Sequence, residues 1–205
     1  MKVSLLESLR LGRRLIANSL SKRPFCVSFE ITASCNARCK HCDRGGIKKE
    51  ENLLEPKEYG ILASNLKPLV VQISGGEPLL RKDVAEIIRE IKKPGHPPFL
   101  ILVTNGSLLN EERYLNLKNC GVNQFSISLD FPDKRHDEFR GISGLFSHLE
   151  KLIPKLSRFG NEDIVLNTAI TSKNTQDLLT LAEIADDWGI SVDHNEARRL
   201  WGLDF

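Results

Sequence analysis

Several features are scarce or missing in this sequence, and each absence excludes a class of protein. Five cysteines in 205 residues are too few for a disulfide-stapled fold. No apolar run approaches the roughly 20 residues that a membrane-spanning helix needs. Arginines interrupt the apolar residues between Leu9 and Ile16, so no secretory signal pattern forms. Unpaired cysteines without such a signal predict a reducing cytoplasm.

Charge and composition are equally unspecialised. The formal net charge is +2, which gives no reason to expect a nucleic-acid partner, and no internal repeat or low-complexity segment is visible. The fractions of hydrophobic residues (40%) and charged residues (27%) are typical of a soluble globular domain with a sizeable core.

Strand and helix signals alternate along most of the chain. Apolar runs of strand length occupy residues 25–32, 69–73, 99–103, 122–129, 164–170 and 190–192. Helical spacing of apolar residues lies between them, and Asp83 with Glu86 predicts a capping pair for the helix that follows. Such alternation indicates βαβ units, a parallel sheet and right-handed crossovers. We therefore expect an α/β fold, a partial (β/α)6 TIM-like barrel that is short at its C-terminal end, with the sixth helix missing or irregular.

The first residues form a separate piece in this prediction. Residues 1–23 read as a basic amphipathic helix, with Leu9, Ile16 and Leu20 among arginines and lysines, and residues 24–205 as the core domain. We expect the apolar side of this helix to pack across the barrel. The alternative is a helix that lies on a membrane surface.

Cys35, Cys39 and Cys42 carry the most information about chemistry. Their C-x3-C-x2-C spacing, directly after the first strand, can hold three corners of a cubane iron–sulfur cluster. A cluster used only for electron transfer normally has four cysteine ligands, so three ligands leave one iron open to a small molecule. The alternative is a structural zinc site with His41 as the fourth ligand, although no second pair of ligands is present.

Polar and glycine-rich segments follow four successive strands. Catalytic groups of parallel α/β folds collect at the carboxyl ends of the strands, which we call the rim. The segments are the cysteine loop, Ser74-Gly75-Gly76-Glu77-Pro78, Thr104-Asn105-Gly106 and the residues from Ser126 to Asp130. Four such segments on one rim indicate a functional site.

With these motifs the sequence resembles the radical S-adenosylmethionine (SAM) superfamily, from Phe25 to about Val192. It is most similar to the branch that includes the enzyme of the first step of molybdenum-cofactor synthesis and the peptide-modifying maturases. The resemblance implies that Cys35, Cys39 and Cys42 ligate a [4Fe-4S] cluster. It also implies that the amino and carboxylate groups of SAM occupy the fourth iron.

The resemblance further assigns SAM contacts by position. It places Gly75, Gly76, Glu77 and Pro78 at the SAM amino group, and Asn105 in the wall of the SAM pocket. It places Ser128 and Asp130 at the ribose, Arg140 at the carboxylate, and Asn167 and Thr168 beside the adenine or ribose. The backbone of His41 is expected near the adenine.

The function implied is reductive cleavage of SAM to methionine and a 5′-deoxyadenosyl radical, which abstracts hydrogen from a substrate in the barrel mouth. An external donor of the flavodoxin or ferredoxin type would supply the electron. The substrate is unidentified and could be a peptide or a cofactor or small-molecule precursor. Two alternatives remain open at this stage: a non-catalytic SAM- or cluster-binding module that depends on a partner, and a zinc-binding structural domain.

Overall fold

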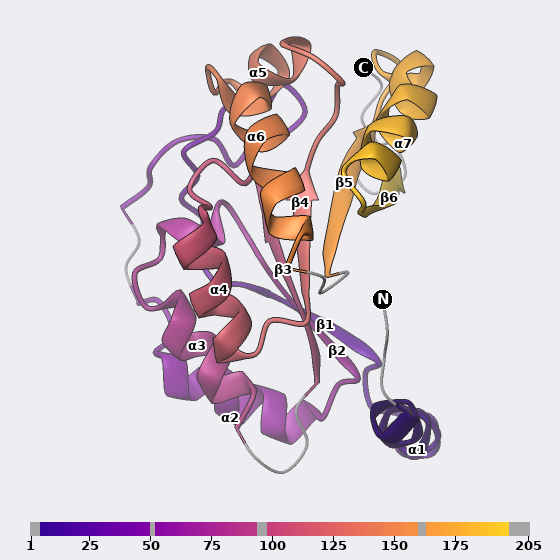
Figure 1. Ribbon diagram of the computed structural model, residues 1–205. Coiled ribbons are helices and arrows are strands. Elements are labelled where there is room, and N and C mark those ends of the chain that lie inside the picture. Colours follow the sequence, from indigo (N-terminus) through magenta and orange to yellow (C-terminus); the bar gives the residue numbers. More distant parts are fainter. Residues whose placement is uncertain (1–4, 50–51, 94–97, 160–162, 197–205) are drawn as a thin grey trace.

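The computed structural model describes residues 5–49, 52–93, 98–159 and 163–196. Its centre is one open sheet of six parallel strands in the order β1-β2-β3-β4-β5-β6 (Figure 1). The strands are β1 (Cys26–Glu30), β2 (Val70–Ser74), β3 (Phe99–Thr104), β4 (Gln124–Ser128), β5 (Ile164–Ile170) and β6 (Ser191–Glu196). Consecutive strands are neighbours throughout, which confirms the predicted α/β partial barrel.

The helices after α1 cover one face of this sheet, except the short α5, which lies beyond the carboxyl ends of the strands (Figure 1). They are α2 (Pro56–Leu66), α3 (Val84–Ile91), α4 (Glu111–Cys120), α5 (Arg135–Arg140), α6 (Leu145–Ser157) and α7 (Leu178–Asp187). Figure 1 shows α2, α3 and α4 side by side, with α6 beyond them. Short 3-10 turns, η1 (Pro78–Leu80) and η2 (Thr175–Asp177), follow β2 and β5.

Alternation along the strands separates a core face from an inner face. In β2, Val71 and Ile73 are fully buried in the core with the helices, whereas Gln72 between them is only half-buried. Because successive side chains point to opposite sides of a strand, Gln72 lies on the other face, which we call the inner face. The hydrophobic core therefore lies between sheet and helices, and the inner face keeps polar groups.

The predicted capping pair of Asp83 and Glu86 differs from the structure. The Asp83 carboxylate does not cap α3; it accepts hydrogen bonds from Arg81 Nε (2.7 Å) and Nη2 (2.9 Å). A capping box is found instead at α2, where the backbone N–H of Glu55 donates to the Glu58 carboxylate (2.7 Å). Arg81 binds the Asp83 carboxylate, which is therefore not available to cap the helix.

Helix α1 (Leu5–Ser21) lies at the amino ends of β1 and β2, where Asn18 Nδ2 donates to the carbonyl oxygens of Pro24 and Lys67 (both 2.9 Å). The prediction that its apolar side packs across the barrel is wrong for Ile16 and Leu20, which are 64% and 82% exposed. None of the described helices is long and apolar enough to cross a membrane. The predicted missing sixth helix falls on residues 197–205, outside the described residues.

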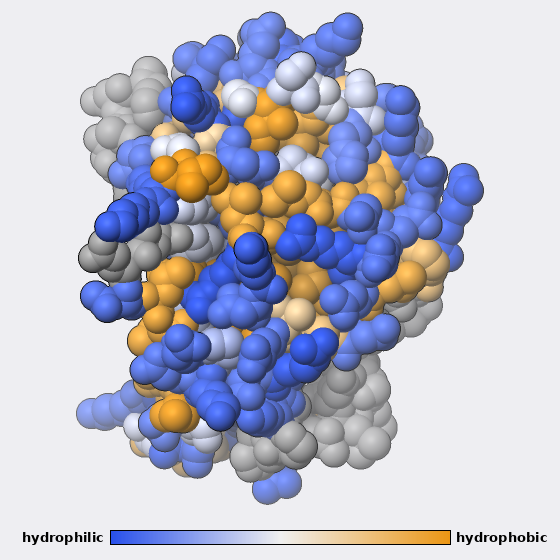
Figure 2. Space-filling view, turned by 90° about the vertical axis from the view of Figure 1, so that its left-hand side faces the viewer, coloured by the Kyte–Doolittle hydropathy of each residue, from blue (hydrophilic) through white to orange (hydrophobic). Residues whose placement is uncertain are grey.

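The outer side of the helix layer is not uniformly polar. Figure 2 shows the side of the molecule that carries α2, α3, α4 and the loop before α2, and hydrophobic residues form an interrupted patch on it. The exposed large hydrophobic residues of these elements are Ile47, Leu53, Leu54, Ile61, Leu62 and Leu115.

Candidate active site

The cysteine loop leaves the carboxyl end of β1. Cys35 and Gly46 exchange two backbone hydrogen bonds (3.0 and 3.1 Å), which close the loop around the other two cysteines. All three thiols are free; Cys35 is buried, Cys39 is half-buried and Cys42 is exposed. Backbone N–H groups point at two of the sulfur atoms, from Ala37 to Cys35 Sγ and from Arg44 to Cys42 Sγ (both 3.4 Å).

The two glycines after β2 lie directly against the start of this loop. The N–H of Gly76 donates to the Thr32 carbonyl (2.7 Å), and the N–H of Glu77 donates to the Ser34 carbonyl (2.8 Å). A Cβ atom at Gly75 would lie 2.3 Å from Thr32 O, and one at Gly76 would lie 2.1 Å from Ser34 O. Gly75 also has a φ of +119°, which favours glycine. The glycines are therefore required by the packing of the loop itself.

Glu77 connects the ends of β2 and β3. Its buried carboxylate accepts hydrogen bonds from Leu79 N–H (3.0 Å), Thr104 Oγ1 (2.7 Å) and Asn105 N–H (2.8 Å). Burial raises the pKa of the Glu77 carboxyl, and these three donors act in the opposite direction. Pro78, the first residue of η1, is buried beside it. Both Glu77 oxygens already have protein donors, which the sequence did not reveal.

A ring of amides joins the cysteine loop to the turn after β3. Asn105 Nδ2 donates to Asn36 Oδ1 (2.9 Å), and Asn36 Nδ2 donates to Ser107 Oγ (2.8 Å). Ser107 completes the ring by donating from Oγ (2.6 Å) and from its backbone N–H (2.9 Å) to Asn105 Oδ1. Asn36 is sequence-adjacent to Cys35, so this ring holds the loop close to its first thiol.

Asp130 and Arg140 form a buried ion pair where β4 ends. Arg140 Nε donates to Asp130 Oδ2 (2.5 Å), and the other carboxylate oxygen accepts the backbone N–H of Ala169 (2.9 Å). The backbone N–H of Asp130 donates to Nδ1 of the buried His136 (3.1 Å). Burial alone would raise the pKa of the Asp130 carboxyl, but the Arg140 charge and hydrogen bond hold it below its ordinary value. Asp130 thus contacts protein groups on both carboxylate oxygens.

The end of α5 pairs with the middle of the cysteine loop. The Arg38 N–H donates to the Arg140 carbonyl (2.9 Å), and the Lys40 N–H donates to the Phe139 carbonyl (2.8 Å). Arg140 Nη1 lies 3.9 Å from Cys39 Sγ. Burial raises the pKa of the Cys39 thiol, and the Arg140 charge opposes that shift. The short helix α5 thereby contacts the loop around Cys39 with both its backbone and the Arg140 side chain.

His41 is held as a neutral aromatic ring. It stacks on Phe139 with ring centroids 4.8 Å apart and an interplanar angle of 19°. Burial, followed by the Arg140 charge, lowers the pKa of His41 to about 4. Its Nδ1 is buried and has no hydrogen-bond partner. The ring is thus engaged by Phe139, and the role expected of the His41 backbone stays a prediction.

Asn167 and Thr168 lie on opposite faces of β5. Thr168 is fully buried, and its hydroxyl donates to the Leu129 carbonyl (2.8 Å). Asn167 is half-buried and pairs in register with Ser128 of β4, the other predicted ribose contact. Alternation therefore brings Asn167 and Ser128 together on the inner face and turns Thr168 away from it.

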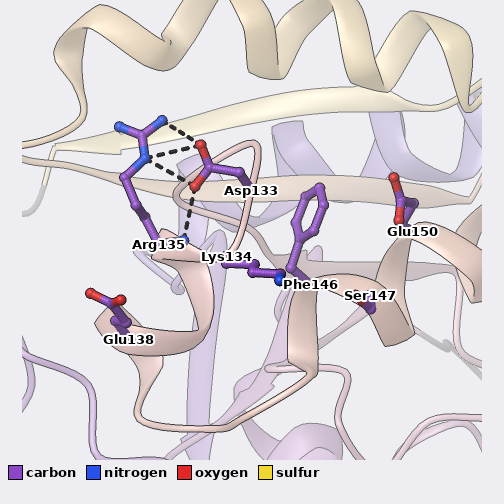
Figure 3. Close-up of a pocket in the computed structure, with 7 residues that line it drawn as sticks. All are labelled: Asp133, Lys134, Arg135, Glu138, Phe146, Ser147 and Glu150. Atoms are coloured by element: carbon purple, nitrogen blue, oxygen red, sulfur yellow. Dashed lines mark hydrogen bonds and ion pairs between the residues drawn. The ribbon is translucent and has the colours of Figure 1, made fainter.

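A pocket on the outer side of α5 contains none of the predicted site residues. It has a volume of about 620 Å³ and lies between α5 and α6 (Figure 3). Figure 3 shows Arg135 bonded to Asp133 on one side of it and Phe146 on the other. The buried residues of α5 are His136, Phe139 and Arg140, so the pocket lies on the other face of this helix. The lining residues are Asp133, Lys134, Arg135, Glu138, Phe146, Ser147 and Glu150.

The sequence profile of the Radical SAM superfamily matches residues 29–185. The chain belongs to this superfamily. The match begins in β1 and ends in α7, so it includes all four rim segments, the cysteine loop among them. The resemblance inferred from the cysteine spacing and from Gly75-Gly76-Glu77-Pro78 is confirmed.

Named radical SAM proteins match the chain over about half of their own length. The AdoMet-dependent heme synthase of Methanosarcina barkeri is 32% identical over 182 residues, which are 86% of this chain and 51% of that protein. A probable GTP 3',8-cyclase of Methanocaldococcus jannaschii is 35% identical over 171 residues, which are 80% of this chain and 55% of that protein. The crystal structure of Streptococcus suis SuiB bound to S-adenosylmethionine has the same fold, with a TM-score of 0.71 and 19% identity, over 96% of this chain and 47% of that one.

Some residues that build this candidate site were not predicted from the sequence. Asn36 and Ser107 complete the amide ring, and His136 supports Asp130. Asn36 and Ser107 flank recognised motifs, so adjacency to Cys35 and to the Thr104-Asn105-Gly106 turn was the available hint. His136 had no such hint, because it accepts from the backbone of Asp130 rather than pairing with a side chain.

Proposed function

We propose that this chain is the catalytic core of a radical SAM enzyme, with a [4Fe-4S] cluster on Cys35, Cys39 and Cys42 and SAM at the fourth iron. When bound and reduced, the cluster would supply the electron that cleaves SAM to methionine and a 5′-deoxyadenosyl radical. The task of this chain would be to hold the thiols, to orient SAM on the rim, and to present the inner face to a substrate.

One observation carries this proposal. Each of the three cysteine sulfurs has one N–H donor: Ala37 for Cys35, Arg44 for Cys42 and the Arg140 guanidinium for Cys39. Burial raises the pKa of the Cys35 and Cys39 thiols, and their donors oppose that shift. Such donors favour thiolate, which is the form that binds iron. Among the described residues, no three His, Cys, Asp or Glu side chains are arranged to hold a single metal ion. A cluster that takes one thiolate per iron fits this donor set better than a mononuclear site.

The SAM contacts belong to the same proposal. Gly75, Gly76, Glu77 and Pro78 would meet the amino group through backbone groups, because both oxygens of Glu77 already accept hydrogen bonds from the protein. Asn105 would line the pocket. Ser128 and Asn167, which share the inner face, are better placed for the ribose and adenine than Thr168. Asp130 would act through Arg140, and His41 through its backbone.

The substrate and the electron donor are the remaining parts of the proposal. SuiB was crystallised with its precursor peptide SuiA, which supports a peptide as one substrate class for this chain. The heme synthase and cyclase relatives support a cofactor or small-molecule precursor. An external donor of the flavodoxin or ferredoxin type would deliver one electron at a time, and a reducing cytoplasm would keep the three thiols available.

Anaerobic reconstitution tests the proposal directly. The wild-type protein should bind iron and sulfide and, after addition of dithionite and SAM, should release 5′-deoxyadenosine. Cys35→Ala, Cys39→Ala and Cys42→Ala should each abolish this product and lower the iron content. Cys120→Ala, a buried cysteine on α4, and Cys26→Ala, an exposed cysteine on β1, are matched controls that should retain both.

Three outcomes would contradict the proposal in different ways. Binding of SAM without cleavage by a fully loaded, reduced protein would favour a non-catalytic module. Stoichiometric zinc without sulfide would favour a structural domain. Retention of the cluster in any of the three alanine variants would remove that cysteine from the ligand set.

A further inference from the structure

The guanidinium of Arg140 is buried between the carboxylate of Asp130 and the sulfur of Cys39. Its Nε donates to Asp130 Oδ2 at 2.5 Å, and its Nη1 lies 3.9 Å from Cys39 Sγ. Cys39 Sγ also approaches the Arg140 carbonyl oxygen at 3.8 Å. Arg140 is 8% exposed, so this contact is shielded from bulk water.

The position of this guanidinium is fixed by Asp130, which is itself held by the protein. Asp130 is anchored by the Ala169 N–H at Oδ1 (2.9 Å), and its carbonyl oxygen accepts Asn174 Nδ2 (3.0 Å). A charge that is buried in a rigid ion pair keeps its direction and distance relative to its neighbours. Arg140 therefore presents a fixed positive charge to the sulfur of Cys39.

The resemblance to the superfamily had assigned Arg140 to the SAM carboxylate. The hydrogen bonds described for the guanidinium use Nε and Nη1. Nη2 could therefore donate to an oxygen of SAM while Nη1 stays beside Cys39, so the two contacts are compatible. The two roles are separable, because the contact with Cys39 does not require SAM.

We propose that Arg140 is a positioning residue that raises the reduction potential of the iron–sulfur cluster through Cys39, with Asp130 as its anchor. This inference rests on the proposed function. One-electron reduction adds negative charge to the cluster and its thiolates, and an N–H donor and a positive charge beside a ligand sulfur stabilise that added charge. Burial weakens screening by solvent and salt, so the effect persists at physiological ionic strength.

Opposite shifts from the two members of the ion pair are the signature of this role. Arg140→Gln removes the donor and the charge, so the midpoint potential should fall. Asp130→Asn removes the negative charge that offsets the guanidinium, so the potential should rise. A purely structural role would disturb the cluster in the same sense in both variants.

The measurement is an EPR-monitored titration of the reconstituted protein with dithionite, without SAM, together with iron and sulfide analysis. Arg140→Lys keeps the charge opposite Asp130 but loses the planar fork that reaches both partners, so it should fold and show a smaller fall. Arg135→Gln is the matched control: it lies on the same helix and pairs with Asp133 and Asp177, and its potential should equal that of the wild type.

The outcomes separate this inference from the proposed function. Wild-type protein that binds no cluster would overturn both. A wild-type cluster whose potential is unchanged in Arg140→Lys and Arg140→Gln would overturn this inference alone. Loss of SAM affinity in those variants, measured by isothermal titration at an unchanged potential, would assign Arg140 to SAM only.

Discussion

Replacement of Gly76 by alanine distinguishes two reasons for glycine at this position. If the glycine only lets SAM approach the backbone, the protein without cofactors should not respond to Gly76→Ala. In the structure, a Cβ at this position would lie 2.1 Å from Ser34 O and 2.5 Å from Ser34 C. Both are backbone atoms of the cysteine loop, so no side-chain rotation can relieve the overlap. The loop must move.

The expected cost follows from what that movement disrupts. Overpacking in a well-packed region typically costs about 1–3 kcal/mol. Separation of the two segments also lengthens the hydrogen bonds from Gly76 N–H to Thr32 O (2.7 Å) and from Glu77 N–H to Ser34 O (2.8 Å). Each such bond contributes about 1 kcal/mol. We therefore expect Gly76→Ala to lower the free energy of unfolding by roughly 2–5 kcal/mol, a large share of ordinary domain stability.

Urea unfolding of the cofactor-free protein, followed by circular dichroism, measures this change. Gly12→Ala is the matched control: apart from its chain neighbours and the backbone of α1, which contains Gly12, no atom lies within 4 Å of a Cβ there. That variant should be neutral or more stable by up to about 1 kcal/mol. A free energy of unfolding for Gly76→Ala within about 0.5 kcal/mol of the wild type would refute the packing argument. The glycine would then be needed only to let SAM approach the backbone.

Three further predictions address separate parts of the site. Burial lowers the pKa of His136 from 6.5 to about 4. Between these two values the unfolded chain binds a proton that the folded chain does not, so the free energy of unfolding should fall by up to about 3 kcal/mol as the pH falls from 6.5 to 4. His136→Asn should weaken this pH dependence in urea unfolding. Thr168→Val should lower the free energy of unfolding by about 1–2 kcal/mol but leave SAM affinity within twofold, whereas Asn167→Ala should weaken SAM binding. Asn36→Ala should open the ring with Asn105 and lower the iron content after reconstitution, because the loop near Cys35 loses its attachment.

Each of these predictions has an outcome that contradicts it. An unchanged pH profile in His136→Asn would mean that other groups set acid stability. A loss of SAM binding in Thr168→Val larger than that in Asn167→Ala would reverse the assignment of the two faces of β5. Full iron and sulfide content in Asn36→Ala would show that the amide ring is dispensable for the cluster.

Hydrophobic periodicity was sufficient for most of the fold. The run of residues 164–170 predicts β5 with the bounds that the structure has. Most of its residues are β-branched or apolar, which is typical of a strand. Helix α5 was missed, since Arg135–Arg140 is short and has no apolar stripe that repeats over two turns. The exposed apolar side chains of α1 were also missed, because periodicity identifies a hydrophobic face without identifying what covers it.

The candidate site was predictable in its motifs but not in its connections. The cysteine spacing and the Gly-Gly-Glu-Pro segment located it, and the structure places both on the rim. The partners of Glu77 and Asp130 were not readable, since Glu77 accepts from residues 27 and 28 positions away and Asp130 accepts from Ala169, 39 positions away. Local patterns describe a residue and its near neighbours, whereas these bonds depend on how the strands are ordered.

The cysteine loop shows why those connections matter for function. The segment from Ile31 to Glu55 contains no helix or strand among its described residues, so regular backbone hydrogen bonding holds little of it beyond the pair of bonds between Cys35 and Gly46. Around its cysteines the loop is held by three separate segments: Gly76 and Glu77 after β2, Asn105 after β3, and Phe139 with Arg140 at the end of α5. Each meets the loop at a different place, before Cys35, beside Cys35 and around Cys39. Thiols held from three sides are organised before any cofactor binds, so the binding energy of a cluster need not be spent on ordering the loop.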